Sequence, residues 1–388
     1  MPTITITATA AVLSDQVGWA ARLLPARPAI PVLAGLRLDI TTDRVRVSAT
    51  DYEVWASADV DADTEGEGVA VLPGRLLAGL LAKLPPLQMV TITITPDRAR
   101  ICCGPTRATL LTLPAEDYPT PPQAPAAVGR TDAAELARAV DQVVVAASTD
   151  PTLVALTGVH TTLTEDGIVM CASDRYRITR QSVAWEPVLD QDDGDDPVLL
   201  VPAAALSQAA KAMTGTVSIA TATDRTGRMD QLSLSDDTRR LSTRLLDCDF
   251  PATTPYLDRA RQDAQLTVSV EAAELAGALD RVKLFAAADT PIRIAITDEG
   301  LAVRAGDDGD AGSEDVPAKV DGQGLQVAFN APFLLTALTS ARAERVQMAI
   351  SEADRPVLLT PDDGDGYQYL VMPIRLGSAS ARTPGGEC

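Results

Sequence analysis

The chain has 388 residues, of which 46% are hydrophobic and only 3% aromatic, and its formal net charge is −20. At about 150 residues per domain, this length predicts two to three domains with cores of Leu, Val, Ile and Ala. The negative charge argues against an ordinary nucleic-acid-binding surface, since such affinity comes from many cations that displace counterions from phosphates. No run approaches the roughly 20 apolar residues of a membrane span, so we expect a cytoplasmic protein without a membrane partner.

One pattern occurs three times along the chain: an apolar strand, a charged turn and a second strand. The three copies begin at Asp43, Asp166 and Glu299. Each copy has a helical pattern before it and another after it, which indicates that the repeating unit is a whole domain. We therefore predict an α+β chain of three repeated domains, each with two helices packed on antiparallel sheets. The predicted bounds are 1–125, 126–255 and 256–376.

The first repeat opens with a loose apolar stripe that predicts a helix over 12–24, ending at Pro25. The strand pair of 43–60 follows. A second helix is predicted where leucines recur over 76–81, directly after a strand and a turn that contains Pro. Alternating apolar residues over 90–94 then predict a strand.

The second and third repeats show the same succession. One apolar stripe predicts a helix over 136–147, and a shorter one predicts a helix over 275–282. The strand pairs occupy 166–183 and 299–316. The remaining helices are centred on the apolar residues of 205–210 and 334–338, and a strand is predicted over 217–220. The chain is thus expected to contain six helices.

Motifs for catalysis and cofactor binding are mostly missing. His160 is the only histidine, which leaves few ways to build a histidine-based hydrolase or a multi-histidine metal site, and we interpret it as structural. The glycine pairs at Gly66 and Gly68 and at Gly322 and Gly324 lack the third glycine of a dinucleotide loop, and no GxxxxGK phosphate loop occurs. The sequence predicts a protein without catalytic residues, metal or cofactor.

Three acidic runs begin at Asp190, Asp307 and Asp362. Each breaks the calcium-loop pattern, because a non-ligand stands at the fifth position and no glycine stands at the sixth. Solvated turns are the favoured interpretation. A metal-dependent nuclease stays open as a remote alternative, although it would need carboxylates that converge from strand ends, and turns are the wrong place for them.

Cations gather on the predicted helices while acids crowd into the turns. They are Arg22, Arg75, Lys83, Arg138, Lys211, Arg281, Lys283 and Arg342. Taken alone, this distribution is typical of solvated helix faces. If six helices lay on one side of the protein, the same cations would form a weakly positive lining. Both interpretations remain open at this point.

Several segments together resemble the bacterial DNA polymerase III beta subunit, the sliding clamp family. They are IPVLAGL at Ile30, LPGRLL and TLPAEDYP in the first repeat, SDRYRIT in the second, and FNAPFLL and YLVMPIRL in the third. These segments follow one another over residues 1–376 in the order and at the spacing that the family has. The resemblance implies a non-catalytic, head-to-tail homodimer whose six domains close a ring around double-stranded DNA. A ring cannot fall off, so weak phosphate contacts suffice and an acidic protein can slide.

The resemblance also implies roles for particular residues. Arg27 and Arg75 match DNA-facing positions of the family. A cleft between the second and third domains takes short peptides from the polymerase III alpha subunit, the clamp loader and other clamp-binding proteins. Its matching residues are Leu156, Ser173, Arg175, Ile178, Pro251, Tyr256, Val371, Met372, Pro373, Ile374 and Arg375. Subunit contact is implied at Leu284, at Phe285 and along the strand from Arg107 to Leu113.

The chain departs from the family at several positions, among them Asp150, Val154, Ala203 and Ala204, where the family can offer DNA contacts. The best-known members have Gly-His where this chain has Arg175 and Tyr176, and a smaller aliphatic residue where it has Tyr256. A specialised second clamp copy, whose altered cleft resists a cleft-binding inhibitor, is therefore an alternative. The chain also continues past the usual end of the family as GSASARTPGGEC. This small, polar segment of 377–388 predicts a disordered tail, and we hypothesise that it alters access to the neighbouring cleft.

Overall fold

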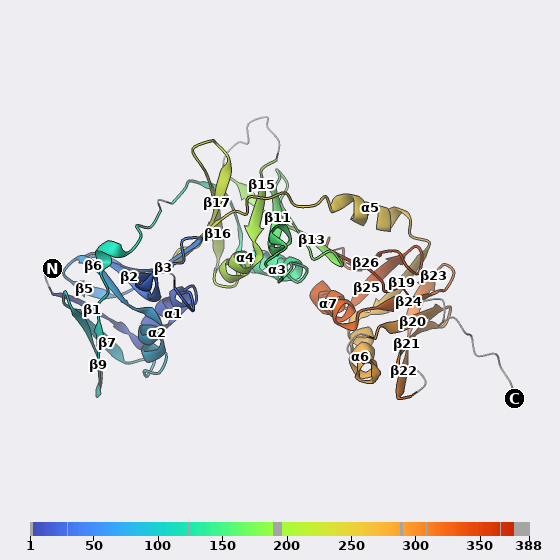
Figure 1. Cartoon of the computed structure of the whole chain (residues 1–388), viewed down its shortest axis with the longest axis horizontal. Helices are drawn as coiled ribbons and strands as arrows, with labels where there is room; N and C mark the ends of the chain where they lie inside the picture. Colours follow the sequence, from blue (N-terminus) through green and yellow to red (C-terminus); the bar gives the residue numbers. More distant parts are fainter. Residues whose placement is uncertain are drawn as a thin grey trace. The chain divides into compact units, whose positions relative to one another are not determined.

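A computed structural model describes residues 3–28, 30–122, 124–188, 196–287, 290–306, 309–364 and 366–375. The predicted tail of 377–388 and most of the acidic run that begins at Asp190 lie outside these residues. The chain divides into two compact units. Figure 1 labels the helices and strands. Unit 1 comprises Met1–Ala137, Trp185–Gly194 and Ala204–Asp247, and unit 2 comprises Arg138–Ala184, Asp195–Ala203 and Cys248–Cys388.

The same succession of elements occurs three times, which confirms the predicted repeat. Each repeat runs strand, helix, five strands, helix, three strands. The first consists of β1 (Ile4–Thr9), α1 (Ala10–Ala21), β2 (Gly35–Ile40), β3 (Val45–Thr50), β4 (Val54–Val60), β5 (Asp63–Glu65), β6 (Gly68–Pro73), α2 (Gly74–Leu81), β7 (Met89–Ile94), β8 (Arg98–Cys103) and β9 (Thr106–Leu111).

The second repeat consists of β10 (Ala127–Asp132), α3 (Ala133–Val144), β11 (Gly158–Leu163), β12 (Ile168–Ser173), β13 (Arg177–Val183), β14 (Glu186–Pro187), β15 (Val198–Pro202), α4 (Ala203–Ala210), β16 (Thr216–Thr223), β17 (Met229–Ser235) and β18 (Arg239–Arg244). The third consists of β19 (Leu266–Glu271), α6 (Ala272–Val282), β20 (Ile292–Thr297), β21 (Gly300–Gly306), β22 (Ala311–Val316), β23 (Ala318–Asp321), β24 (Gln326–Phe329), α7 (Ala331–Ala341), β25 (Arg345–Ile350), β26 (Val357–Pro361) and β27 (Gln368–Val371).

The helices differ from the prediction in several respects, and α3 begins and ends three residues earlier than expected. The described residues contain a seventh α-helix, α5 (Thr254–Gln262), in which only Leu257 and Ala260 are buried. α1 begins earlier than predicted, because the Thr9 hydroxyl accepts a hydrogen bond from the Val12 amide and caps it, and α1 ends at Ala21. In α2, Leu76 is 61% exposed and does not share the buried face of Leu77 and Leu81.

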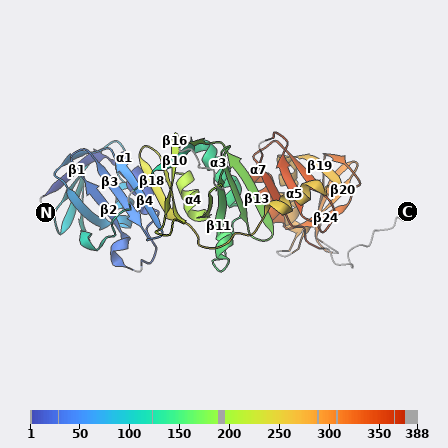
Figure 2. The ribbon, with the colours of Figure 1, turned by 90° about the horizontal axis from the view of Figure 1, so that it is seen from above.

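Unit 1 contains a nine-stranded antiparallel sheet in the order β14-β10-β16-β17-β18-β4-β3-β2-β6. Strands of the second and first repeats meet where β18 pairs with β4, with Leu241 opposite Ala56. Figure 2 shows β18, β4, β3 and β2 side by side. A five-stranded sheet, β5-β1-β7-β8-β9, completes the first repeat and leaves β9 as an edge strand.

A single arginine reinforces this junction between repeats. The Arg239 guanidinium lies 2.6 Å from the Asp15 carboxylate, donates to the Gln16 side chain at 2.9 Å, and donates to the Ala212 carbonyl at 2.9 Å. Its plane also faces the buried ring of Trp19. Because the side chain is mostly buried, these charge-assisted bonds hold α1 to the second-repeat strands more firmly than an exposed ion pair would.

Unit 2 repeats this plan. Its nine-stranded sheet has the order β15-β11-β12-β13-β27-β26-β25-β19-β23, and the second and third repeats meet where β13 pairs with β27, with Ile178 opposite Leu370. A four-stranded sheet, β22-β21-β20-β24, leaves β22 as an edge strand. Helices α6 and α7 pack on each other and bury Leu275, Leu279 and Leu334 in the third-repeat core.

A buried polar network joins the two repeats within unit 2. The Tyr367 hydroxyl donates to the Gln142 carbonyl at 3.0 Å and lies 2.9 Å from the Ser340 hydroxyl. The Gln181 amide donates to the Gln142 side chain at 3.0 Å, and the Thr179 hydroxyl donates to the carbonyl of Val143 at 2.7 Å. The end of α3, β13 and the third repeat are thus linked through groups that water does not reach.

We expect Tyr367→Phe to lower the apparent free energy of unfolding of unit 2 by about 1–3 kcal/mol, because it removes the hydroxyl from two buried hydrogen-bonding partners. The effect would be measured by urea unfolding followed by circular dichroism. The exposed Tyr52 offers a matched control, and Tyr52→Phe should change stability by less than about 0.5 kcal/mol. Equal losses of stability in the two variants would contradict this account of the network.

Candidate functional site

Three neighbouring strands of unit 2 bring several predicted cleft residues together. Ser173 at the end of β12 lies opposite Ile178 on β13, and Ile178 lies opposite Leu370 on β27. Just beyond β27, the Met372 amide donates to the Tyr176 carbonyl at 2.8 Å. Opposed residues of antiparallel strands share a face, so Ser173, Ile178 and Leu370 form one row across the sheet.

The turn between β12 and β13 is fixed by an aspartate and presents two exposed side chains. The Asp174 carboxylate accepts hydrogen bonds from the amides of Tyr176 and Arg177, both at 3.0 Å. Arg175 adopts a φ of +81°, a left-handed conformation that disfavours side chains with a Cβ by roughly 1–2 kcal/mol. The two hydrogen bonds to the Asp174 carboxylate hold the turn in this conformation without a glycine at position 175.

Arg177, which the sequence did not single out, holds this turn against the third repeat. Its guanidinium donates to the Asp174 carboxylate at 2.8 Å and to the Tyr369 hydroxyl at 3.3 Å. It also lies 4.5 Å from the centre of the Phe333 ring, a cation–π arrangement, and the ring of Tyr176 stands 6.2 Å from the same ring. The exposed Tyr176 is therefore backed by a cluster of ordered aromatic and charged groups.

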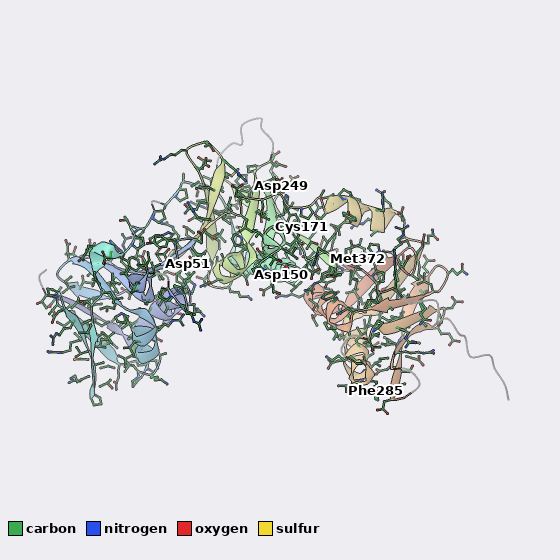
Figure 3. The ribbon with its side chains drawn as sticks, viewed as in Figure 1. Asp51, Asp150, Cys171, Asp249, Phe285 and Met372 are labelled. Atoms are coloured by element: carbon green, nitrogen blue, oxygen red, sulfur yellow. The ribbon has the colours of Figure 1, made fainter. Side chains whose placement is uncertain are left out.

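A hollow of about 470 Å³ gathers three predicted cleft residues: Tyr256, Met372 and Arg375. Tyr256, Arg259, Ala260 and Asp263 line it from α5 and its end, and Met372, labelled in Figure 3, is 40% exposed by its accessible surface. The hollow also contains the carboxylates of Asp263, Glu352 and Asp354, the last at 3.4 Å from the Arg375 guanidinium. An exposed thioether and a phenol ring can pack against an apolar anchor, while the charged rim can bind polar groups of a peptide.

Other predicted cleft residues lie elsewhere. Pro251 lines a separate hollow of about 390 Å³ with Cys171 and Phe250. Ile374 lines a third, of about 370 Å³, together with Leu284, and its amide donates to the Ala328 carbonyl at 2.7 Å. Leu156 and Pro373 are buried, and none of the hollows described for this part of the chain is lined by either.

The assignment of Val371 to an accessible cleft surface is not supported by its position. Its exposed fraction is 0%, and its side chain belongs to the core of the third repeat. Strand alternation explains the difference, because Val371 shares the inward face of β27 with Tyr369, while Leu370 shares the outer face with Ile178. Leu370 is also buried, at 3% exposure, in one cluster with Ile178 and with Leu257 of α5.

The predicted subunit-contact residues lie on exposed edges. Leu284 is 78% exposed and Phe285 46% exposed, in a short turn of helix after α6. Phe285 is labelled in Figure 3. The Phe285 ring covers the edge strand β22, where a Cβ at Gly312 would lie 2.3 Å from it. In unit 1, Arg107 and the exposed Leu111 belong to the edge strand β9. The apolar side chains of Leu284 and Phe285 in unit 2 and of Leu111 in unit 1 are therefore available to a partner.

The predicted DNA-facing residues fall into two groups. Arg22, Arg27 and Lys83 are exposed and form no ion pair within the described part of the chain. The remaining ones have contacts. Arg75 donates to the Leu24 carbonyl at 2.7 Å, and Arg138 lies 3.4 Å from the Gln142 side chain. Arg281 binds the Glu314 carboxylate at 2.8 Å, and Arg342 binds the Asp141 carboxylate at 3.1 Å. Lys211 is exposed. Ion pairing reduces the positive charge that Arg281 and Arg342 offer to a phosphate.

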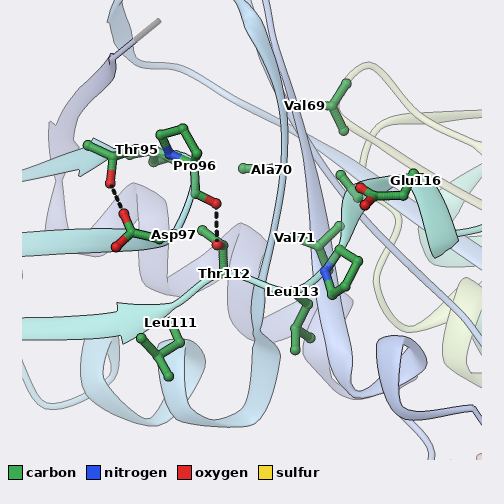
Figure 4. Close-up of a pocket in the computed structure, with 13 residues that line it drawn as sticks. Val69, Ala70, Val71, Thr95, Pro96, Asp97, Leu111, Thr112, Leu113 and Glu116 are labelled. Carbon is green, nitrogen blue, oxygen red and sulfur yellow. Dashed lines mark hydrogen bonds between the residues drawn. The ribbon is translucent and has the colours of Figure 1, made fainter. Parts of the chain in front are cut away.

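Unit 1 contains a larger hollow, of about 560 Å³, that is lined in part by Leu111, Thr112 and Leu113 at the end of the predicted subunit-contact strand. Figure 4 shows it between β6 and the turn of 95–97, where the Thr95 hydroxyl bonds to Asp97 at 3.0 Å. The Thr112 hydroxyl donates to the Pro96 carbonyl at 2.7 Å and ties the end of β9 to the same turn. The hollow separates the edges of the two unit 1 sheets.

Metal-binding clusters and membrane-spanning helices are both absent from the described residues. No group of three or more His, Cys, Asp or Glu side chains there is arranged to hold a metal ion. Among the same residues, no helix has the length and hydropathy needed to cross a membrane.

Family models for the DNA polymerase III beta subunit match the chain in three consecutive segments. The N-terminal domain model matches 4–122, the central domain model 131–252, and the C-terminal domain model 261–375. Each segment lies within one of the three predicted domains, and together they account for most of the chain.

Curated relatives and solved structures agree with these models. The chain is 37% identical to the beta sliding clamp of Streptomyces coelicolor and 30% identical to the beta sliding clamp homolog GriR of Streptomyces muensis. Each alignment covers 94% of this chain and 97% of the relative. The fold is similar to the Pseudomonas aeruginosa sliding clamp bound to griselimycin, with a TM-score of 0.87 and 22% identity over 97% of this chain and 100% of that one. The Bacillus subtilis clamp gives the same TM-score, identity and coverage.

Proposed function

The chain belongs to the family of bacterial DNA polymerase III beta subunits, the sliding clamps of DNA replication, and we propose that two copies close head to tail into a ring around duplex DNA. The ring confers processivity by tethering the polymerase and has no catalytic activity of its own. Its domains are residues 1–125, 126–255 and 256–376, and it acts in the cytoplasm.

The internal repeat of the chain is the observation that carries this proposal. The last strand of the second repeat, β18, pairs with β4 of the first, and the last strand of the third, β27, pairs with β13 of the second. The equivalent of β4 and β13 in the third repeat is β22, and the equivalent of β18 and β27 in the first repeat is β9. Both are edge strands in the sheets of one chain. Pairing of β9 with β22 of another copy would make every junction equivalent.

Charge and exposure along the two edges support this pairing. β9 carries Arg107, whereas β22 carries Asp315 and also Glu314, which pairs with Arg281 within the chain. Leu284 and Phe285 stand beside β22, and Leu111 is exposed on β9. An interface between these edges would therefore combine main-chain hydrogen bonds, opposite charges and apolar burial.

Arg22, Arg27 and Lys83 are the best candidates for phosphate contacts, because no described carboxylate offsets them. We expect the triple replacement by Gln to weaken binding to linear duplex DNA and to reduce the slope of log K against log salt by about 0.9 for each phosphate that is no longer neutralised. Fluorescence anisotropy over a series of salt concentrations would measure this. Arg281→Gln with Arg342→Gln is the control, whose smaller effect follows from their ion pairs. A larger effect of the control would contradict the assignment.

The cleft of unit 2 is proposed to bind short peptides from the polymerase III alpha subunit, the clamp loader and other clamp-binding proteins. The exposed Met372 and Tyr256 beside α5 supply the apolar surface, and Arg175, Tyr176 and Arg375 supply a polar rim. The supporting side chains, Arg177 and Phe333, are ordered by their own contacts, which lowers the entropy lost on binding.

A specialised second copy of the clamp is the alternative. One relative is the clamp homolog GriR, and one structural neighbour is a clamp bound to griselimycin. Arg175, Tyr176 and Tyr256 give this cleft side chains that would change the affinity of a ligand seated there. Weaker griselimycin binding than by the other clamp of the same cell, with equal peptide binding, would favour the specialised copy. If the two clamps bind griselimycin equally and bind peptides equally, the housekeeping role is favoured. The identity to the Streptomyces coelicolor clamp, which is higher than that to GriR, also favours it.

Primer extension with the cognate polymerase and clamp loader tests the function. With a DNA trap present, adding this protein should lengthen the products of a single binding event. Products of unchanged length would contradict the proposal. Loss of label from DNA incubated with the protein and Mg²⁺ or Mn²⁺ alone would instead support the remote nuclease alternative.

A further inference from the structure

A second hollow opens on the same sheet face as the cleft and differs from it in chemistry. It has a volume of about 390 Å³ and lies in unit 2, between strands β11, β12 and β13 and the segment of 250–254. His160, Cys171 and Arg180 line it from three adjacent strands, His160 opposite Cys171 and Cys171 opposite Arg180. Because opposed residues share a face of the sheet, the three polar side chains form one row beneath the hollow.

The charge in this hollow is of one sign. None of the eleven residues that line it is acidic, although the chain contains 53 Asp and Glu. Arg180 makes no hydrogen bond or ion pair with another residue that the structure describes, and it is half-buried. By contrast, the hollow beside α5 is lined by three carboxylates. A guanidinium without a partner, surrounded by hydroxyl groups, is suited to a carboxylate.

The neighbouring side chains would accept an anion without repulsion. Burial lowers the pKa of His160, so its imidazole is neutral near pH 7 and presents an N–H donor. Burial also raises the pKa of the Cys171 thiol, which lies 3.1 Å from the Thr253 hydroxyl, so no thiolate competes there. The Phe250 ring, with its centre 5.3 Å from that of His160, gives the hollow an apolar wall against which the methylene groups of an acidic side chain can pack.

The hollow adjoins the row that Ser173, Ile178 and Leu370 form across the sheet. Cys171 is two residues from Ser173 along β12, and Arg180 is two residues from Ile178 along β13, on the same face. Two residues of a strand span about 7 Å, which is also the reach of two residues of an extended peptide. Pro251 borders this hollow and matches a cleft position of the family. Ser173 and Ile178 are 5% and 9% exposed, so a peptide anchor is expected to lie above this row, with its next-but-one side chain above Arg180.

We propose that the hollow is an anion-binding subsite that takes the carboxylate of a clamp-binding peptide, two residues from the apolar anchor that occupies the cleft. This proposal rests on the proposed function, since it concerns peptides bound at that cleft. It assigns Arg180 as a specificity-determining residue, with His160 and Thr254 as further hydrogen-bond donors.

Paired peptides would test this with the full-length protein. Each labelled peptide carries one Leu-Phe anchor, with Glu or Gln two residues before the anchor in one pair and two residues after it in the other. We expect Glu to bind about tenfold more tightly than Gln in one of the pairs. Arg180→Gln should abolish that preference and leave the affinity of the Gln peptide unchanged. Arg304→Gln, an exposed arginine of β21, is the control and should retain the preference.

His160 provides an independent readout, because it is the only histidine and gives a single imidazole signal in NMR spectra. The Glu peptide should shift this signal more than the Gln peptide does, and Arg180→Gln should remove the difference. If Gln and Glu peptides bind equally in both pairs, the subsite proposal is wrong and the peptide cleft stands. A preference for Glu that survives Arg180→Gln also overturns it. If no peptide binds, both the subsite and the proposed cleft are wrong.

Discussion

Replacing Leu284 or Phe285 by Lys is expected to convert the dimer into monomers at micromolar concentration. Each residue is exposed in the isolated chain, so the variant should fold, yet the proposed contact would bury the new charge without a partner. A loss of about 3 kcal/mol at each of two contacts would weaken dimerisation by roughly 10⁴-fold. Sedimentation velocity over a concentration series would measure the change in dissociation constant.

Leu87 provides the matched control for this experiment. It is 89% exposed and lies in unit 1 between α2 and β7, away from both edge strands in sequence. Leu87→Lys makes the same chemical change and should leave the dissociation constant within about twofold. An unchanged dimer in Leu284→Lys and Phe285→Lys would refute the assignment of this interface, and dissociation of all three variants would show only a general effect of charge.

Met372→Lys is expected to weaken peptide binding at the cleft by about 10- to 100-fold. The thioether lies at the mouth of the hollow beside Tyr256, where an apolar anchor would cover it, and a lysine there would be desolvated on binding. Because Met372 is partly exposed, the fold should be retained. Fluorescence anisotropy with a labelled Leu-Phe peptide would give the two affinities.

Met89 serves as the control, since it is an exposed methionine at the start of β7 in unit 1. Met89→Lys should bind the peptide as the unmodified protein does. If Met372→Lys binds the peptide within twofold of the unmodified protein, the peptide lies elsewhere, and the residues that line the hollow beside α5 are not its site.

Repetition explains why most of the fold could be predicted from the sequence. The strand pairs of 43–60 and 166–183 contain the same turn, in which Asp51 or Asp174 accepts two backbone amides and the next residue takes a positive φ. Such local chemistry is visible in sequence, and it recurs with the period of the domains. By contrast, α5 has few apolar residues and a Pro in its first turn, so no apolar stripe indicated it.

Pairing between distant residues could not be predicted. Arg281 and Arg342 are cations on or beside helices in the sequence, but their carboxylate partners, Glu314 and Asp141, are 33 and 201 residues away. Similarly, the anchoring role of Arg177 depends on Phe333 and Tyr369, which come from the third repeat. The family resemblance implies one continuous surface over 371–375, whereas strand geometry buries Val371 and exposes Met372.

The central claim is that the protein encircles DNA as a closed ring. Comparing how much loaded protein stays on circular DNA and on linearised DNA tests this claim most directly. After loading by a cognate clamp loader, the labelled protein would be separated with the DNA on a sizing column at high salt, where weak phosphate contacts are screened. We predict that it stays with closed circular DNA and is lost once a restriction enzyme opens the circle. Equal retention on both forms would mean that affinity and not topology holds the protein, which would contradict the ring. Loss from both forms, with an intact dimer, would contradict its loading as a clamp.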